Sequence, residues 1–184
     1  MTLFVVYAPE TGHVVGAVDT LGAPPLPPPD AAGTVDPSPF VGAALPLRVS
    51  VDAGERAIVS VPARELAAHG PDDEPAVLGD PFAFGVEQVD GRPPKPALVR
   101  LRTWSSGVSF TSEGLSVTVP TADQVNVTHV VAFVGAGPET RTTSGDIKAG
   151  EKSVVLPIAV ENGTHGVLVL VAGWAGRLEA VAKP

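Results

Sequence analysis

The sequence of 184 residues contains no cysteine, which excludes disulfide bonds, thiolate metal sites and a cysteine nucleophile. Charged residues are also scarce: they make up 17% of the chain, against roughly 25% in an ordinary domain. Acidic residues outnumber basic ones by 20 to 12, which gives a formal net charge of −8. We therefore expect no nucleic-acid partner, because phosphate binding needs clustered Lys and Arg side chains.

Long apolar runs are absent as well. The longest one, residues 167–175, is much shorter than the ~20 residues that a membrane-spanning helix needs. The first nine residues lack the positively charged start of a signal peptide. We expect a protein without a membrane span, located in the cytoplasm or in a released particle.

The usual signatures of catalysis and of cofactor binding are missing. The segment Ser105-Ser106-Gly107 lacks the leading glycine of a serine-nucleophile turn. The run 130–137 ends in Gly135-Ala136-Gly137, but neither the third glycine nor the helix of a dinucleotide site follows. No local pair at metal-binding spacing occurs among the four histidines, which are His13, His69, His129 and His165. The sequence predicts no enzyme, no cofactor and no metal, and an enzyme with a site built from scattered residues is an alternative.

Hydrophobic residues make up 44% of the chain and recur with a period of two. In residues 47–51 and 115–119 they alternate with polar residues, which is typical of strands with one face in the core. The runs 3–8, 130–134 and 167–172 are apolar on both faces, which favours strands covered on both sides. The pattern predicts an all-β fold of sandwich or barrel-like units.

Turn sequences separate these runs. Pro9-Glu10-Thr11-Gly12 lies between two apolar runs and predicts a hairpin. Asn162-Gly163, a favoured hairpin dipeptide, precedes the last long apolar run. Only residues 62–69 are predicted to form a short helix, with Pro62 at the start and Gly70-Pro71 at the end.

Residues 21–46 form a proline-rich arm that contains Pro24-Pro25-Leu26-Pro27-Pro28-Pro29. Proline cannot donate to a β ladder, so we expect an extended, polyproline-like chain. A stiff segment loses little entropy on docking, so we expect the arm to pack against a neighbouring copy or another subunit. Its apolar anchors would be Leu26, Val35, Phe40 and Val41. A PxxP ligand for an aromatic groove is an alternative.

A second proline-rich segment, residues 90–96, is the expected boundary between an N-terminal β unit (1–92) and a C-terminal one (93–184). A shift of 96 positions aligns residues 53–59 with 149–155, and His69 with His165. This alignment favours an internal duplication of a β unit. Chance similarity in a composition rich in Ala, Gly and Val is the alternative.

Three side chains near the middle of the chain are candidates for interaction. Arg100 and Arg102 alternate with Val99 and Leu101 and precede Trp104. We expect the two arginines to face outward and to protect the edge strand of a sheet. Stacking on a ligand sugar or on an aromatic side chain of a partner is the alternative.

The C-terminal part of the chain follows a recognisable order of strands. A strand at 115–120, a long strand at 127–134, a Gly-rich connection, a strand at 153–157 and the run 166–175 resemble a fibronectin type III or immunoglobulin-like sandwich. The Cys-free, acidic, strand-rich chain with its proline-rich arm is also similar to accessory subunits of phage tails or phage-tail-like contractile injection systems.

We expect a non-enzymatic structural or interaction protein that self-associates or binds other subunits of a multi-protein assembly, because the chain is strand-rich, lacks catalytic signatures and carries a stiff arm. The resemblance implies that this assembly is phage-tail-like or virion-like. A β-sandwich module that binds carbohydrate or another ligand through aromatics such as Trp104 and Trp174 is the alternative.

Overall fold

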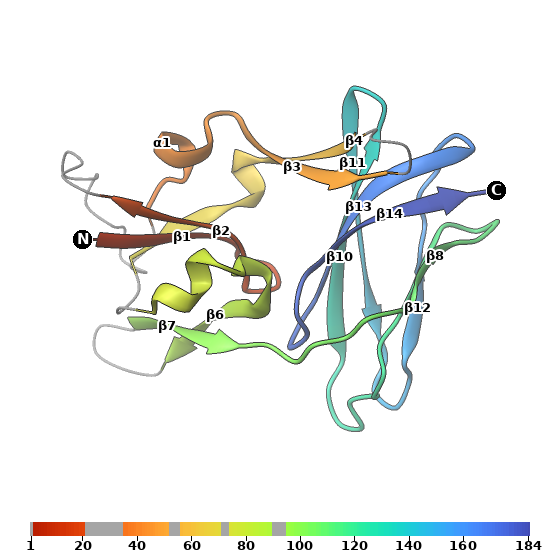
Figure 1. The fold of residues 1–184 in the computed structure, drawn as a ribbon. Coiled ribbons are helices and arrows are strands. Elements are labelled where there is room, and N and C mark those ends of the chain that lie inside the picture. The colour runs from red at the N-terminus through yellow and green to blue at the C-terminus, as the bar shows by residue number, and fades with distance from the viewer. Residues whose placement is uncertain (1, 21–34, 52–55, 71–73, 90–94) are drawn as a thin grey trace.

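The computed structural model describes residues 2–20, 35–51, 56–70, 74–89 and 95–184. Strands dominate, and the strands form antiparallel sheets (Figure 1). The predicted all-β fold is thus confirmed. No helix in the described ranges is long and apolar enough to cross a membrane.

The N-terminal half builds a five-stranded sheet with the order β5-β1-β2-β6-β7. Its strands are β1 (Thr2–Ala8), β2 (His13–Thr20), β5 (Ala67–His69), β6 (Phe84–Val89) and β7 (Lys95–Arg100). The predicted hairpin joins β1 to β2, and Gly12 adopts a φ of 75° in its turn. An added Cβ at Gly12 would lie 2.8 Å from the carbonyl oxygen of Val86. Glycine is therefore needed here for both conformation and space.

The C-terminal half is a sandwich of two sheets. The first has the order β11-β10-β13-β14, with strands β11 (Glu139–Ile147), β10 (Thr128–Ala136), β13 (Gly163–Val171) and β14 (Arg177–Lys183). The second has the order β12-β9-β8, with strands β12 (Ser153–Leu156), β9 (Leu115–Thr118) and β8 (Val108–Phe110). Between them lies a core of alternate side chains, among them Leu115, Val117, Val130, Val167 and Val169.

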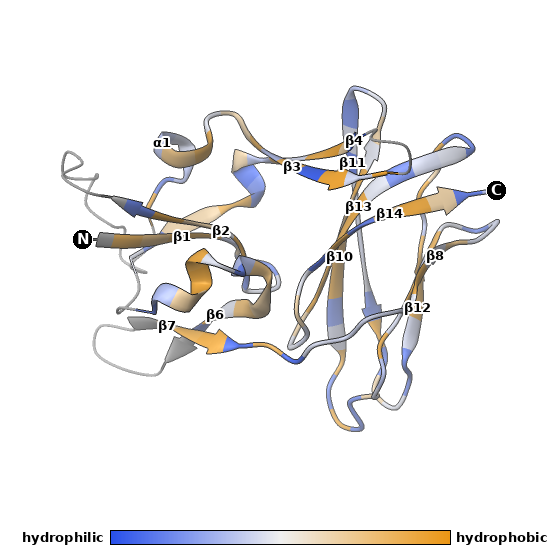
Figure 2. Cartoon of the chain, in the orientation of Figure 1, coloured by the Kyte–Doolittle hydropathy of each residue, from blue (hydrophilic) through white to orange (hydrophobic). Residues whose placement is uncertain are grey.

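The four-stranded sheet is covered on its other face by the N-terminal half (Figure 2). There the remaining side chains of β10 and β13, Val131, Phe133, Leu168 and Leu170, form a second core with residues from β1, β2 and β4. The apolar runs at 130–134 and 167–172 therefore have both faces buried, as their sequence predicts.

A separate two-stranded hairpin supplies part of this cover. It consists of β3 (Ala44–Ser50) and β4 (Arg56–Pro62), paired in the register Leu47 to Val59. Two glycines let the hairpin approach the sheet closely. A Cβ on Gly135 would clash with the carbonyl oxygen of Ile58, and one on Gly166 would lie 3.1 Å from side-chain atoms of Ala57 and Val59.

The change between the two halves does not lie at residues 90–96. Strand β6, which ends at Val89, pairs with β7, which begins at Lys95, so the residues before and after positions 90–94 belong to the same five-stranded sheet. The chain passes to the sandwich only after β7, through residues 101–107. A proline-rich sequence marks a connection, but it does not distinguish a hairpin turn from a domain linker.

The short helix expected at residues 62–69 is present only as one 3₁₀ turn, η2 (Ala63–Glu65). Residues 67–69 instead form β5, because their backbone pairs with β1. The described residues contain three other short helical elements: α1 (Ser38–Val41), η3 (Pro75–Leu78) and η4 (Pro81–Ala83). Tertiary pairing overrides the local helix propensity of residues 62–69.

The aligned stretches of the proposed duplication have related strand orders. In the first half β5 joins the β1–β2 hairpin at β1, and in the second half β13 joins the β10–β11 hairpin at β10. The intervening strands differ, because β4 pairs with β3 whereas β12 pairs with β9. The duplication stays a prediction that the shared order β5-β1-β2 and β13-β10-β11 supports.

Candidate functional site

The most exposed apolar side chains of the described residues lie on one loop, residues 119–127 between β9 and β10. Val125 is 81% exposed and Val127 is 59% exposed, whereas the other exposed large hydrophobic side chains are all below 50%. Isolated exposed valines are ordinary on protein surfaces. Two of them on a single fixed loop form a more specific feature.

Asp123 fixes the conformation of this loop. Its Oδ1 accepts hydrogen bonds from the backbone N–H groups of Val125, at 2.8 Å, and Asn126, at 2.9 Å. These two bonds, with the Asn126 bond first, hold the pKa of Asp123 below its usual range. The carbonyl oxygen of Asp123 accepts a further bond from the N–H of Gly150, 2.7 Å away. The two valines are thus presented by a loop that is already ordered.

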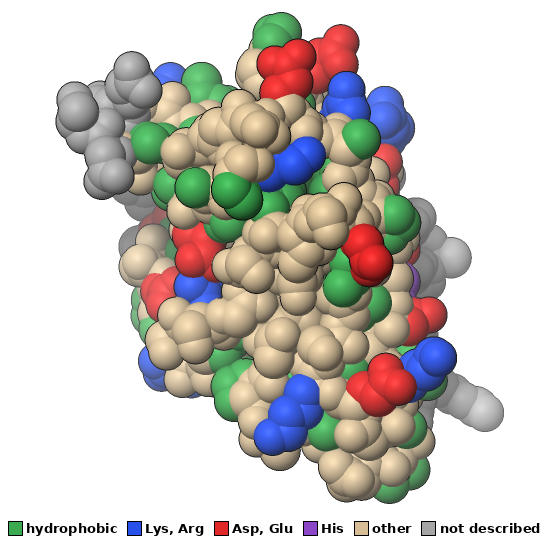
Figure 3. All heavy atoms as spheres, turned by 90° about the vertical axis from the view of Figure 1, so that its right-hand side faces the viewer, with side chains coloured by type: hydrophobic (Ala, Val, Ile, Leu, Met, Phe, Trp, Pro, Cys, Tyr) green, Lys and Arg blue, Asp and Glu red, His purple; other side chains and the backbone are tan. Residues whose placement is uncertain are grey.

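Three basic residues lie near this loop. The bond from Gly150 brings the turn at 148–152, with exposed Lys148 and Lys152, beside the loop. Arg102 also lies close enough to Asp123 to lower its pKa slightly. At the lower end of Figure 3, green hydrophobic side chains accompany blue and red charged ones. An apolar centre with a charged rim is the usual anatomy of a protein contact. We call residues 119–127 with Lys148, Lys152 and Arg102 the tip surface.

The predicted residues Arg100, Arg102 and Trp104 make contacts within the chain. Arg100 lies 5.9 Å above the ring of Phe84, and Arg102 lies 5.5 Å above the ring of Trp174. Both arginines are exposed. Arg100 ends β7, the last strand of its sheet, in keeping with a role at an edge.

Trp104 anchors residues 101–107, which connect the two halves, to the sandwich. Its Nε1–H donates to the carbonyl oxygen of Ala175 over 2.7 Å, and the guanidinium of Arg177 lies 4.9 Å from its ring centroid. Trp174 is 8% exposed. The ring of Trp104 is engaged by Arg177, and that of Trp174 is buried under Arg102, so neither is presented as an open platform for a sugar.

Three of the four anchors predicted in the proline-rich arm pack against the chain's own second core. Val35 is 7% exposed and exchanges two backbone hydrogen bonds with Ala68, of 2.8 and 3.0 Å. Phe40 and Val41 pack against the second core, and the ring of Phe40 lies 5.3 Å from that of Phe4. Leu26 lies outside the described residues. The arm residues from 35 onward therefore serve the chain's own core, because β5 and β1 offer them both a ladder and an apolar surface.

Three of the histidines hold separate parts of the chain together. His165 faces the carbonyl oxygens of Gly135 and Glu161, each at 2.9 Å. His13 faces the carbonyl oxygen of Trp174, and His129 lies between Glu10 and Asp146. Within the described ranges no three His, Asp or Glu side chains have the geometry of a metal site.

Two shallow hollows lie on the surface that the described residues form. One, of about 340 Å³, lies between β4, the β10–β11 turn and the loop before β13, and includes exposed Arg56, Glu161 and Thr164. The other, of about 180 Å³, lies between the β1–β2 turn, η2 and β10, over Val131 and Phe133. Neither one is lined by a buried polar side chain that lacks a partner among the described residues.

The sequence interpretation missed the tip surface, because residue 127 was assigned to the start of a long strand. A signal was present: Asp123 precedes Asn126 by three residues, and an aspartate at that position often caps the following backbone N–H groups.

Comparison of the chain with known protein families, with curated proteins and with solved structures finds no match.

Proposed function

We propose that this protein is a non-enzymatic subunit of a protein assembly, and that the tip surface is where it contacts another subunit. The observation that carries the proposal is the pair Val125 and Val127, which a hydrogen-bonded loop holds in water at 81% and 59% exposure. Holding apolar side chains in water has no benefit for the isolated chain. A preordered loop reduces the entropy lost on docking.

The size of the effect can be bounded. Full burial of a valine side chain is worth about 1.5–3 kcal/mol. Two such side chains could therefore contribute about 3–6 kcal/mol to a contact, before the costs of association are subtracted. That is enough for the two valines to act as hot spots, but not enough to form a permanent complex alone.

The partner of first choice is a second copy of the chain. The tip surface carries the carboxylate of Asp123 near the guanidinium of Arg102, and the exposed Lys148 and Lys152 flank Gly150, whose N–H donates to the carbonyl oxygen of Asp123. A mixed-charge rim of this kind can pair with itself across a two-fold axis, because each carboxylate can meet a cation of the other copy.

Sedimentation velocity over a range of protein concentrations tests the proposal. We expect reversible self-association that weakens by at least about ten-fold in the double variant V125S/V127S. The matched control is Leu78→Ser, which removes an apolar side chain that is 43% exposed on η3, in the N-terminal half. Association that is equal in both variants, or a wild-type chain that stays monomeric at every concentration, would contradict the proposal.

The resemblance to accessory subunits of phage tails or injection systems fits an assembly role, and it remains part of this proposal. Binding of carbohydrate through Trp104 is less well supported, because Arg177 lies over that ring at 4.9 Å.

A further inference from the structure

Two histidines tie the β1–β2 turn to the C-terminal sandwich. The turn spans residues 9–12, and Glu10 within it meets His129 of β10. His13, directly after the turn, meets the carbonyl oxygen of Trp174, which follows β13. Both contacts join residues that are more than 100 positions apart, so they fix how the hairpin lies on the sandwich.

His129 bonds to a carboxylate at each ring nitrogen. Its Nδ1 is 2.7 Å from Oδ1 of Asp146, and its Nε2 is 2.8 Å from Oε1 of Glu10. An ionised carboxylate can only accept a hydrogen bond, so both nitrogens must donate, and this requires the doubly protonated, positively charged ring. The bond to Asp146 and then that to Glu10 raise the pKa of His129, against the effect of partial burial.

His13 has the opposite environment. It is fully buried, its Nε2 donates to the carbonyl oxygen of Trp174 at 2.6 Å, and its Nδ1 lies 2.9 Å from Oγ1 of Thr11. Burial lowers the pKa of His13 to about 4 despite these bonds. His13 therefore stays neutral over the range in which His129 changes its charge, and it can serve as the permanent anchor of the turn.

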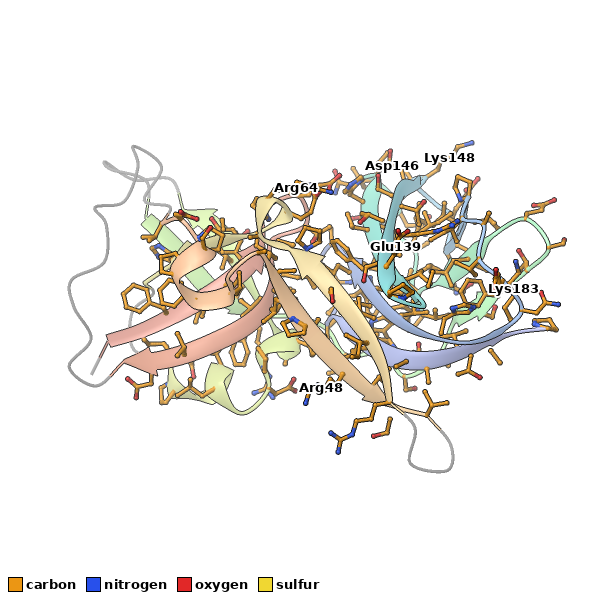
Figure 4. The ribbon with its side chains drawn as sticks, turned by 90° about the horizontal axis from the view of Figure 1, so that it is seen from above. Arg48, Arg64, Glu139, Asp146, Lys148 and Lys183 are labelled. Carbon is orange, nitrogen blue, oxygen red and sulfur yellow. The ribbon has the colours of Figure 1, made fainter. Side chains whose placement is uncertain are left out.

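Two further charged side chains lie near the turn. Arg64 and Glu65 of η2 line the same small hollow as Glu10, and they pair with each other at 3.2 Å. Figure 4 places Arg64 on the N-terminal half, on the same side of the molecule as Asp146 of the sandwich. The groups that bond to the His129 ring are Glu10, from the turn, and Asp146, from β11.

We propose that Glu10, His129 and Asp146 form a pH-sensitive latch that holds the β1–β2 turn on the sandwich while His129 is protonated and releases it when the proton is lost. A neutral ring can donate to only one of the two carboxylates, and it turns a lone pair toward the other. The latch adds its full stability below the ordinary histidine pKa of 6.5 and loses it as the pH rises through the raised pKa of His129.

The opening is local. The second core joins the halves through apolar side chains, among them Val6, Val15, Phe133 and Leu168. Release of the latch therefore frees the turn at Glu10, while the turn stays attached at His13 and the two sheets remain packed.

An NMR titration of the histidine rings of the full chain is the first test. We expect the His129 midpoint to lie above 6.5, and His13 to show no titration until about pH 4. In Glu10→Gln the His129 midpoint should fall toward 6.5. The matched control, Glu139→Gln, removes a carboxylate from the other end of β11 and should leave the His129 midpoint unchanged. A wild-type midpoint at or below 6.5, or the same midpoint in both variants, would overturn the latch.

Hydrogen exchange measures the opening itself. Exchange of residues 7–14, corrected for the intrinsic effect of pH, should become about two- to five-fold faster as His129 loses its proton, since an exposed ion pair contributes up to about 1 kcal/mol. In His129→Gln this pH-dependent step should vanish. Exchange that does not follow the His129 titration would show that the turn is held by other contacts, and the proposal would be wrong.

Discussion

Replacing Gly135 by alanine should loosen the β3–β4 hairpin from the four-stranded sheet. The new Cβ would clash with the backbone carbonyl oxygen of Ile58 in β4. A backbone atom cannot rotate aside as a side chain does, so the hairpin must move away. The second core, which includes Val59 and Val61 of β4, would then lose close packing.

The expected cost is that of an overpacked core, about 2–3 kcal/mol. For a chain of this size it corresponds to a fall in melting temperature of roughly 4–12 °C. Gly16→Ala is the matched control, because Gly16 lies in β2 and its added Cβ would meet Leu45 of β3 at an ordinary 3.7 Å. That variant should stay within about 1 kcal/mol of the wild type, because alanine suits a strand better than glycine.

Urea unfolding of the two variants gives the comparison directly. Hydrogen exchange of residues 44–62 then shows whether the loss begins in the hairpin, where protection should fall before that of β9 or β12. If Gly135→Ala proves as stable as Gly16→Ala, the hairpin does not lie on this face of the sheet, and the shared second core would have to be abandoned.

Two further predictions concern buried residues. Below pH 6.5 the unfolded chain binds a proton at His13, whereas the folded chain binds it only at about pH 4. The free energy of unfolding should therefore fall by about 2 kcal/mol between pH 8 and pH 5. Urea unfolding at both pH values should show this fall in the wild type but not in His13→Gln, and an equal fall in both proteins would refute the prediction. Val35→Ala should lower the free energy of unfolding of the isolated chain by about 2 kcal/mol, because Val35 is 7% exposed. If unfolding is unchanged in this variant but self-association is weaker, the arm is instead a contact element for another copy.

Local patterns in the sequence predict most of the strands. The alternation at 115–119 corresponds to β9, and the fully apolar runs correspond to β10 and β13, which are buried on both faces. These predictions succeed because side-chain alternation and burial are properties of a single strand. The layer that covers the second face could not be predicted in the same way, since part of it comes from β3 and β4, some 80 residues earlier in the chain, and the rest from β1 and β2.

The functional residues show the same limit, with one exception. Glu10 approaches His129 only because the two halves pack together, and no local pattern in the sequence predicts this contact. The pairing of His129 with Asp146, in contrast, follows from the register of the β10–β11 hairpin, in which Ala136 lies opposite Glu139. A two-residue turn at Gly137-Pro138 fixes that register, so this contact could have been predicted from the sequence.

The position of the four-stranded sheet between two layers has a consequence for folding during synthesis. The β3–β4 hairpin is complete by residue 62, but β13, which helps to cover it, ends at Val171. At roughly 5–20 residues per second, about 5–20 s pass between these points on the ribosome. During that time the apolar side of the hairpin lacks the part of its cover that β13 supplies. The first part of the chain to be synthesised is therefore among the last to complete its packing.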